Sequence, residues 1–278
     1  MRQYIARTAL SGDGLLEVQG KDYRYMKQVL RLAAGDMLSV RLTDGRLQGM
    51  TVARIDEQAR RIVLQVCAGA PAAPVENMPA AAPGAAGASG GLPELWLFQF
   101  VARSAKMDLI IRQATECGVS LIVPVVSDFS QAGVGERNFR SERYQRIIRE
   151  ARQQSGSGTA TRVHETLPLA DAIALWKEHC GDDAAGSAGG SLGFVLYERT
   201  ERTRSLYEAV GRGRIDRAAL VCGAEGGISP AELEALCDAG FVPLHFKTNI
   251  LRCETAALYG IAALQSALAE GDIWQCKE

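Results

Sequence analysis

The sequence predicts an α/β protein in which a small β-barrel precedes an α/β domain with a parallel sheet. Three observations lead to this prediction: a strand-rich pattern in the first 66 residues, a stretch of Ala, Pro and Gly, and alternating strands and helices after it. The chain has 278 residues, of which 47% are hydrophobic and 23% charged, an ordinary globular composition. We therefore expect a barrel over residues 1–67, a linker or loop over residues 68–91, and an α/β domain over residues 92–278.

The first segment favours strands because Leu38–Leu42 alternates apolar and polar residues and Asp44-Gly45 supplies a turn. Further strand-like residues follow at 47–55 and 62–66, and Tyr23–Leu32 has the spacing of a short helix. The first 66 residues hold eleven Lys and Arg against seven Asp and Glu, a net charge of about +4. This charge suits contact with nucleic-acid phosphates and is equally consistent with an ordinary charged surface.

In the second segment the apolar residues alternate between the spacing typical of strands and the spacing typical of helices. The pattern predicts strands at 94–101, 121–126, 194–197, 218–222 and 242–246, and helices at 106–117, 141–154 and 254–269. A further helix begins at Pro230, because Ser229 and Glu232 form a capping box, and ends near Gly240. Strands that alternate with helices in this way favour a parallel sheet.

Several common functional classes lack their signatures in this chain. There is no phosphate-binding P-loop, no H-E-x-x-H zinc motif and no G-x-S-x-G nucleophile motif. The seven cysteines form no C-x-x-C pair, and the three histidines are scattered. No apolar run is long enough to cross a membrane, and the first residues do not resemble a secretory signal. We expect a reduced, cytoplasmic protein that binds no metal and no membrane.

Two segments near the C-terminus are candidates for chemistry. Gly223–Gly227 follows a predicted strand directly, and glycines at the carboxyl end of a parallel strand let the backbone approach a ligand. Arg252 and Glu254 follow the next strand along the chain, so we expect them at the same sheet edge, on an adjacent strand. The alternatives are a tight turn for the glycines and an ion pair that caps a helix for the two charged residues.

The helix over residues 141–154 belongs to a region in which arginine recurs every third residue, at 137, 140, 143, 146, 149 and 152. This spacing winds the arginines around the helix rather than along one face. Glu136 with Arg140, and Glu142 with Arg146, have the spacing of i,i+4 ion pairs. The helix is therefore either a solvated, salt-bridged element or a contact for phosphates.

The chain resembles the RsmE family, the 16S rRNA (uracil-N3)-methyltransferases of the SPOUT superfamily. Five ordered motifs carry the resemblance: Val29–Asp36, Gln113–Val119, Arg143–Ser155, Gly223–Gly227 and Ile250–Ala256, the last without a mismatch. The resemblance implies a PUA-like N-terminal barrel, a C-terminal α/β domain with a trefoil knot, a homodimer, and 16S rRNA or the 30S subunit as substrate. It also implies S-adenosylmethionine as the methyl donor.

The resemblance assigns roles to particular residues. Arg252 would neutralise charge on the uracil carbonyls, and Glu254 and Thr255 would orient the base or Arg252. The cofactor-binding residues would be Leu196, Tyr197, Gly223, Glu225, Gly226, Gly227, Leu244, Phe246, Asn249, Ile250 and Leu251. The RNA-binding residues would be Arg2, Arg24, Lys27, Arg31, Arg143 and Gln154.

Some positions depart from the family pattern. Phe129 and Ser157 stand where the family has Arg, Thr161 and Ala224 where it has Pro, and Lys247 where it has Gly. Two alternative functions stay open, and the departures support only the first of them. One is a non-catalytic protein that binds the ribosome or rRNA, and the other is a knotted RNA methyltransferase that modifies the ribose 2′-O.

Overall fold

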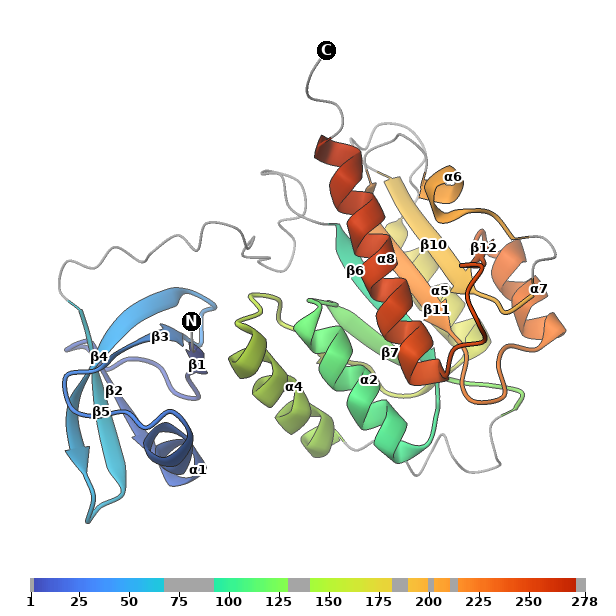
Figure 1. The fold of residues 1–278 in the computed structure, drawn as a ribbon. Coiled ribbons are helices and arrows are strands. Elements are labelled where there is room, and N and C mark those ends of the chain that lie inside the picture. Colours follow the sequence, from blue (N-terminus) through green and yellow to red (C-terminus); the bar gives the residue numbers. More distant parts are fainter. Residues whose placement is uncertain are drawn as a thin grey trace. The chain divides into compact units, whose positions relative to one another are not determined.

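The computed structural model describes residues 3–67, 93–129, 141–181, 190–199, 203–210 and 215–273. The chain divides into two compact units (Figure 1). The first consists of Met1–Ala82 with Arg152–Gly158, and the second of Pro83–Ala151 with Thr159–Glu278. The expected linker over 68–91 lies outside the described residues.

The first unit is a five-stranded mixed sheet in the order β1-β3-β4-β5-β2. Its strands are β1 (Gln3–Ile5), β2 (Leu15–Gln19), β3 (Met37–Arg41), β4 (Leu47–Asp56) and β5 (Arg61–Val66). β1 and β3 are parallel, the other pairs are antiparallel, and the β4–β5 register shifts between Val52 and Arg54. Among the described residues β1 and β2 do not pair, so the predicted barrel is present as an open half-barrel.

A short helical segment packs on this sheet. α1 (Gly20–Arg24) continues into a π-helical turn, η1 (Tyr25–Val29), and buries Tyr23 and Met26 in the core of the unit. The sequence predicted one helix over residues 23–32, so the helical segment begins and ends about three residues earlier than expected. Beyond the segment, Arg31 has a φ of 54°, a left-handed conformation that is rare for arginine.

The second unit contains a seven-stranded sheet in the order β12-β10-β11-β6-β7-β8, with β9 also paired to β7, and every pairing is parallel. The strands are β6 (Glu94–Phe100), β7 (Leu121–Val126), β8 (Arg162–Val163), β9 (Leu167–Pro168), β10 (Gly190–Leu196), β11 (Ile215–Cys222) and β12 (Val242–Leu244). The prediction of a parallel sheet is confirmed. The expectation that the strands before the two candidate segments are adjacent is wrong, because β10 lies between β11 and β12.

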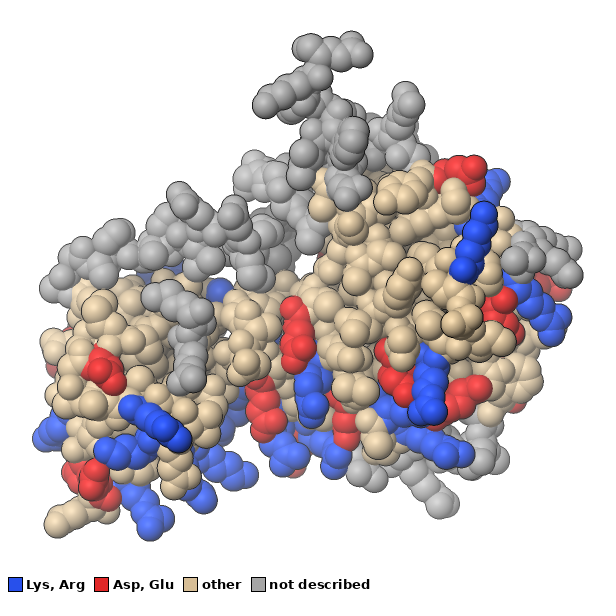
Figure 2. All heavy atoms as spheres, viewed as in Figure 1, with Lys and Arg blue, Asp and Glu red and all other residues tan. Residues whose placement is uncertain are grey.

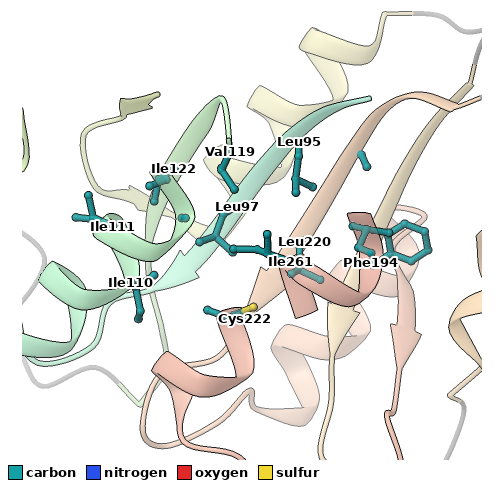
Figure 3. Packing of buried hydrophobic residues seen from close by; sticks show 14 of the residues in the cluster. Leu95, Leu97, Ile110, Ile111, Val119, Ile122, Phe194, Leu220, Cys222 and Ile261 are labelled. Carbon is teal, nitrogen blue, oxygen red and sulfur yellow. The ribbon is translucent and has the colours of Figure 1, made fainter. Parts of the chain in front are cut away.

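Helices cover both faces of this sheet (Figure 1). α2 (Ser104–Glu116), α4 (Ser141–Ser155), α6 (Leu206–Val210) and α8 (Cys253–Ile273) supply residues to one core, and α5 (Leu169–Cys180) and α7 (Pro230–Asp238) supply residues to the other. Figure 3 shows the first core, where Leu97 and Leu220 from the central strands meet Ile110 and Ile261 from the helices. Both faces of the central strands are buried, which is why they read as continuous apolar runs.

None of the described helices is both long and apolar enough to cross a membrane. The described residues also contain no cluster of three or more His, Cys, Asp or Glu side chains that could hold a metal ion.

Candidate cofactor and catalytic site

A cavity of about 500 Å³ lies at the carboxyl ends of β10, β11 and β12. Residues 196–198, 223–228 and 244–253 form most of its wall, apart from Lys247. The expectation that the glycine-rich turn and the arginine segment meet at one sheet edge is therefore confirmed, with the end of β10 between them. All eleven residues that the family resemblance assigns to cofactor binding line this cavity.

The turn Gly223–Gly227 is closed by a hydrogen bond from the Gly227 amide to the Ala224 carbonyl at 3.1 Å. Gly227 has a φ of 76°, and a Cβ on Gly223 would come within 2.9 Å of the Gly227 carbonyl carbon. A Cβ on Gly226 would come within 2.8 Å of the Phe129 Cβ. The turn itself therefore requires Gly223 and Gly227, and the packing of Phe129 requires Gly226. These glycines also bring backbone to the cavity wall.

Buried polar groups hold this turn in place. Glu232, which is 5% exposed, accepts hydrogen bonds from the amides of Ser229 and Asp128, both at 2.7 Å. The Ser229 hydroxyl donates to Asp128 at 2.7 Å, and Glu232 N donates back to that hydroxyl at 3.1 Å. The predicted capping box is confirmed and does more than start α7. It joins the chain after the turn to the end of β7.

The buried amide of Gln99, on β6, supports the other end of the turn. Its Nε2 donates to the carbonyls of Phe100 at 3.0 Å, Gly223 at 3.1 Å and Cys222 at 3.4 Å. The carbonyl of Gly223 is therefore fixed from the neighbouring strand.

The segment after β12 is more exposed than the turn. Residues 247–250 are all exposed, and Ile250 is 87% exposed although it lines the cavity. His245 lies within hydrogen-bond distance of the Tyr197 carbonyl, with Nδ1 and O 3.2 Å apart. Lys247 has a φ of 50°, a conformation that suits the glycine found there in the family. Lys247 does not line the cavity, so its side chain does not block the site.

Arg252 lines the cavity with an exposed side chain, and its guanidinium has no hydrogen-bond or ion-pair partner within the described part of the chain. Glu254 pairs with Lys106 instead, so the alternative of an Arg252–Glu254 ion pair is not observed. Glu254 and Thr255 lie in the first turn of α8, outside the cavity lining. Of the three predicted catalytic residues, the structure therefore brings Arg252 to the cavity and leaves the other two beside it.

Lys106 is a cavity residue that the sequence did not reveal. Its Nζ, on the first turn of α2, lies 3.3 Å from Glu254 Oε2, 3.5 Å from Glu225 Oε1 and 3.8 Å from Cys253 Sγ. Partial burial lowers the pKa of Lys106, but the hydrogen bond to Glu254 and the neighbouring negative charges outweigh it and raise the pKa. The ammonium is therefore charged at neutral pH and joins the Gly223–Gly227 turn to the start of α8.

The thiol of Cys253 lies beside these charges and donates to Glu254 Oε2 at 3.3 Å. Burial and this hydrogen bond raise the pKa of Cys253 to about 11, although Lys106 acts in the opposite direction. The thiol is therefore neutral at neutral pH. Glu254 has a lowered pKa, mainly because its carboxylate accepts a hydrogen bond from its own amide, with smaller contributions from Cys253 and Lys106.

The residues expected to bind RNA have varied surroundings. Arg24 and Arg31 are exposed, whereas Lys27 pairs with Glu57 at 3.0 Å. The guanidinium of Arg143 binds both carboxylate oxygens of Asp108, so α4 is tied to α2. Gln154 is exposed near the end of α4, and Arg2 lies outside the described residues.

The positions that depart from the family pattern differ in burial. Phe129 is 55% exposed and packs beside Gly226. Ser157 is buried, and Thr161 donates to the Val119 carbonyl at 2.7 Å.

On α4 the described i,i+4 ion pair is Arg146–Glu150 at 3.9 Å rather than Glu142–Arg146. The expected Glu136–Arg140 pair lies outside the described residues.

Comparison with known proteins matches residues 91–265 to the RNA methyltransferase domain family. Ribosomal RNA small subunit methyltransferase E of Aquifex aeolicus is 28% identical over 178 residues, which cover 62% of this chain and 69% of that protein. Methyltransferase E 2 of Borreliella burgdorferi is 22% identical over 276 residues, covering 97% and 99%.

Among solved structures, a ribosomal RNA small subunit methyltransferase E from Neisseria gonorrhoeae, bound to S-adenosyl methionine, superposes with a TM-score of 0.71. It is 22% identical, and the match covers 96% of this chain and 97% of that one. This likeness extends the shared fold over both units. Because the family match spans more than half of the sequence and includes the whole cavity, the chain belongs to the RNA methyltransferase domain family.

Proposed function

We propose that this methyltransferase transfers the methyl group of S-adenosylmethionine to N3 of a uridine in 16S rRNA. The observation that carries the proposal is the cavity at the ends of β10, β11 and β12, in which Arg252 has no partner among the described residues. The names of the relatives support rRNA of the small subunit as the substrate class. The family resemblance of Ile250–Ala256 supports the uracil base as the target.

The cavity suits a cofactor of this kind. Its volume of about 500 Å³ lies within the usual range for small-molecule sites. Leu196, Ile228 and Phe246 offer apolar surface, and the glycine-rich turn offers backbone groups. Glu198 and Glu225 also line the cavity, and their negative charge complements a sulfonium cation. S-adenosylmethionine, when bound, supplies an electrophilic methyl group that needs only an aligned nucleophile.

The roles of the chain's own residues follow from their charges and positions. N3 of uracil becomes a good nucleophile when its proton passes to solvent, and the negative charge then spreads to the carbonyl oxygens. The new N3–methyl bond replaces the methyl–sulfur bond, whose electron pair stays on the departing thioether. The guanidinium of Arg252 stabilises that charge because it lines the cavity without a competing partner among the described residues. Glu254 and Thr255, in the first turn of α8, orient Arg252 or the base. The target base is unpaired or flipped out, because N3 lies inside a base pair.

The proposal also covers the RNA contacts and the assembly. Figure 2 shows more basic than acidic side chains on the visible face of the first unit, and the exposed Arg24 and Arg31 belong to this unit. These residues, with Arg2, Lys27, Arg143 and Gln154, contact phosphates of the 16S rRNA or the 30S subunit. The half-barrel is a PUA-like module, the cofactor segments form part of a trefoil knot, and two copies pair in the cytoplasm.

The decisive experiment compares 16S rRNA from cells with and without this protein by mass spectrometry of nucleosides and fragments. Loss of one N3-methyluridine, restored by the wild-type gene but not by Arg252→Ala, is the expected result. Loss of a 2′-O-methylated ribose instead would assign the protein to the other reaction. Calorimetry tests the cofactor separately. Absence of binding by S-adenosylmethionine and by its demethylated product, with unchanged rRNA, would leave a protein that only binds RNA.

A further inference from the structure

Two cations share the cavity, and they differ in their partners. Lys106 is 27% exposed and contacts the carboxylates of Glu225 and Glu254, which are 34% and 15% exposed. Arg252, two residues before Glu254, has no such partner among the described residues. One cation, Lys106, therefore contacts two partly buried carboxylates, Glu225 in the cavity wall and Glu254 beside it, and a second cation, Arg252, contacts neither within the described part of the chain.

We infer that Lys106 is a positioning residue of this site: by pairing with Glu225 and Glu254, it keeps these carboxylates from capturing Arg252 and leaves that guanidinium free to meet the substrate. This inference rests on the proposed role of Arg252. Carboxylates that are partly removed from water and lack a cation are costly, so a nearby flexible guanidinium turns toward them when Lys106 is absent. An Arg252 held in this way no longer reaches the base.

A purely mechanical role for Lys106 is the competing explanation. The amide of Arg103 also donates to Glu225 Oε1 at 3.3 Å, so the start of α2 contacts the glycine-rich turn through two groups. In a mechanical role, Lys106 would simply tie α2 to the turn and to α8. The two explanations predict opposite results when a carboxylate is removed together with Lys106. If the mechanical link matters, removing the Glu225 carboxylate slows methyl transfer further in the Lys106 variant. If the unpaired charge matters, removing this carboxylate restores part of the lost rate.

The test measures single-turnover methyl transfer to 16S rRNA or 30S subunits at saturating S-adenosylmethionine, and cofactor affinity by calorimetry. The variants are Lys106→Met, Lys106→Arg, Glu225→Gln and Lys106→Met/Glu225→Gln. We expect Lys106→Met to slow transfer at least about tenfold, the size of effect typical for a group that positions a catalytic charge. Lys106→Arg should remain within about threefold of wild type, because arginine can still bridge the carboxylates.

The double variant decides between the explanations. Recovery of at least half of the lost rate, on a logarithmic scale, supports the inference, whereas a rate equal to or below that of Lys106→Met overturns it. Arg112→Met is the matched control, because Arg112 is an exposed cation on the same helix outside the cavity. If Lys106→Met does not fold or does not bind the cofactor, Lys106→Gln replaces it. A methyl-transfer rate within threefold of the wild-type rate in either variant overturns the inference. An inactive wild-type protein would instead count against the proposed function.

Discussion

The turn Gly223–Gly227 and the segment of residues 245–252 line the same cavity but are held in different ways. The turn is fixed by the buried Gln99 and is followed by the capping box around Glu232. The second segment has four consecutive exposed residues, and the Thr248 hydroxyl donates only to the adjacent Asn249 carbonyl at 3.0 Å. One wall of the site is therefore held by several buried hydrogen bonds. The other is held, among the described residues, mainly at its start, where His245 contacts the Tyr197 carbonyl and Phe246 packs against Tyr259.

This difference suits the proposed function, in which the site receives two very different molecules. A rigid wall lowers the entropy that is lost when a small cofactor binds. A wall with exposed side chains can adjust to a large RNA and can place Arg252 against the base after the RNA has bound. Substitutions in the turn should therefore affect stability and cofactor affinity, whereas substitutions in the second segment should affect the reaction and leave the fold intact.

The largest expected effect is on the exposed segment. Arg252→Ala should lower the methyl-transfer rate by at least about 10²-fold, because it removes the group that stabilises developing charge. The melting temperature should change by less than about 2 °C, because Arg252 is exposed and unpaired among the described residues. Transfer assays and thermal denaturation of Arg252→Ala and Arg112→Ala, side by side, check this. Near-normal transfer by Arg252→Ala would remove this residue from the mechanism.

The second-largest expected effect is on stability, at the wall formed by the turn Gly223–Gly227 and the capping box that follows it. Glu232→Ala should lower the free energy of unfolding by about 3 kcal/mol, because the amides of Ser229 and Asp128 both lose their acceptor. Urea denaturation measures this loss, and Glu234→Ala, on the exposed face of the same helix, should change stability by less than about 0.5 kcal/mol. Equal effects of the two substitutions would show that the turn does not depend on the capping box.

A smaller effect is expected where Phe129 packs on the turn. Gly226→Ala should weaken cofactor binding by about tenfold, because the new Cβ would lie 2.8 Å from the Phe129 Cβ and displace the turn. Phe129 is exposed, so Gly226→Ala/Phe129→Gly, which removes the Phe129 Cβ, should recover part of the affinity in calorimetry. Gly12→Ala, at a position where a Cβ meets nothing within 4 Å, serves as the control. A double variant no better than Gly226→Ala would place the strain elsewhere.

The smallest expected effect is a pH dependence of the melting temperature that Glu254, in the first turn of α8, contributes. The pKa of Glu254 is lowered, chiefly by a hydrogen bond from its own amide, so its contribution to stability is present above the ordinary carboxylate range and disappears as the pH falls through the lowered pKa. The difference in melting temperature between wild type and Glu254→Gln should therefore shrink between about pH 5 and pH 3. A difference that stays constant or grows on acidification would contradict this assignment.

The elements of the second unit that the sequence predicted are those with a strong local signal. The buried strands read as apolar runs, and the helix after Ser229 has its capping box written in four residues. The short β8 and β9 and the helix α5 were not predicted, because two-residue strands depend on their neighbour β7 and α5 has only two buried residues. The position of β10 between β11 and β12 is a property of the topology, which no local pattern encodes.

The same distinction applies to the site. The glycine-rich turn and Arg252 could be found because each lies in a short motif at the end of a predicted strand. Lys106 could not be found, because its partners Glu225 and Glu254 are distant in sequence and meet it only in the folded chain. Arg143 is a related case. Its phosphate contact stays a prediction, and its partner Asp108, from α2, could not be found from the sequence.

The neutral state of the Cys253 thiol limits unwanted methylation of the protein itself. In the proposed function this cavity holds a methyl donor, so a cysteine at its wall is a potential acceptor of the wrong methyl group, since thiolates are far better nucleophiles than thiols. Because the pKa of Cys253 is raised to about 11, its side chain is almost entirely in the neutral thiol form at pH 7. The surroundings that bury this sulfur thus reduce methylation of Cys253 before the substrate binds.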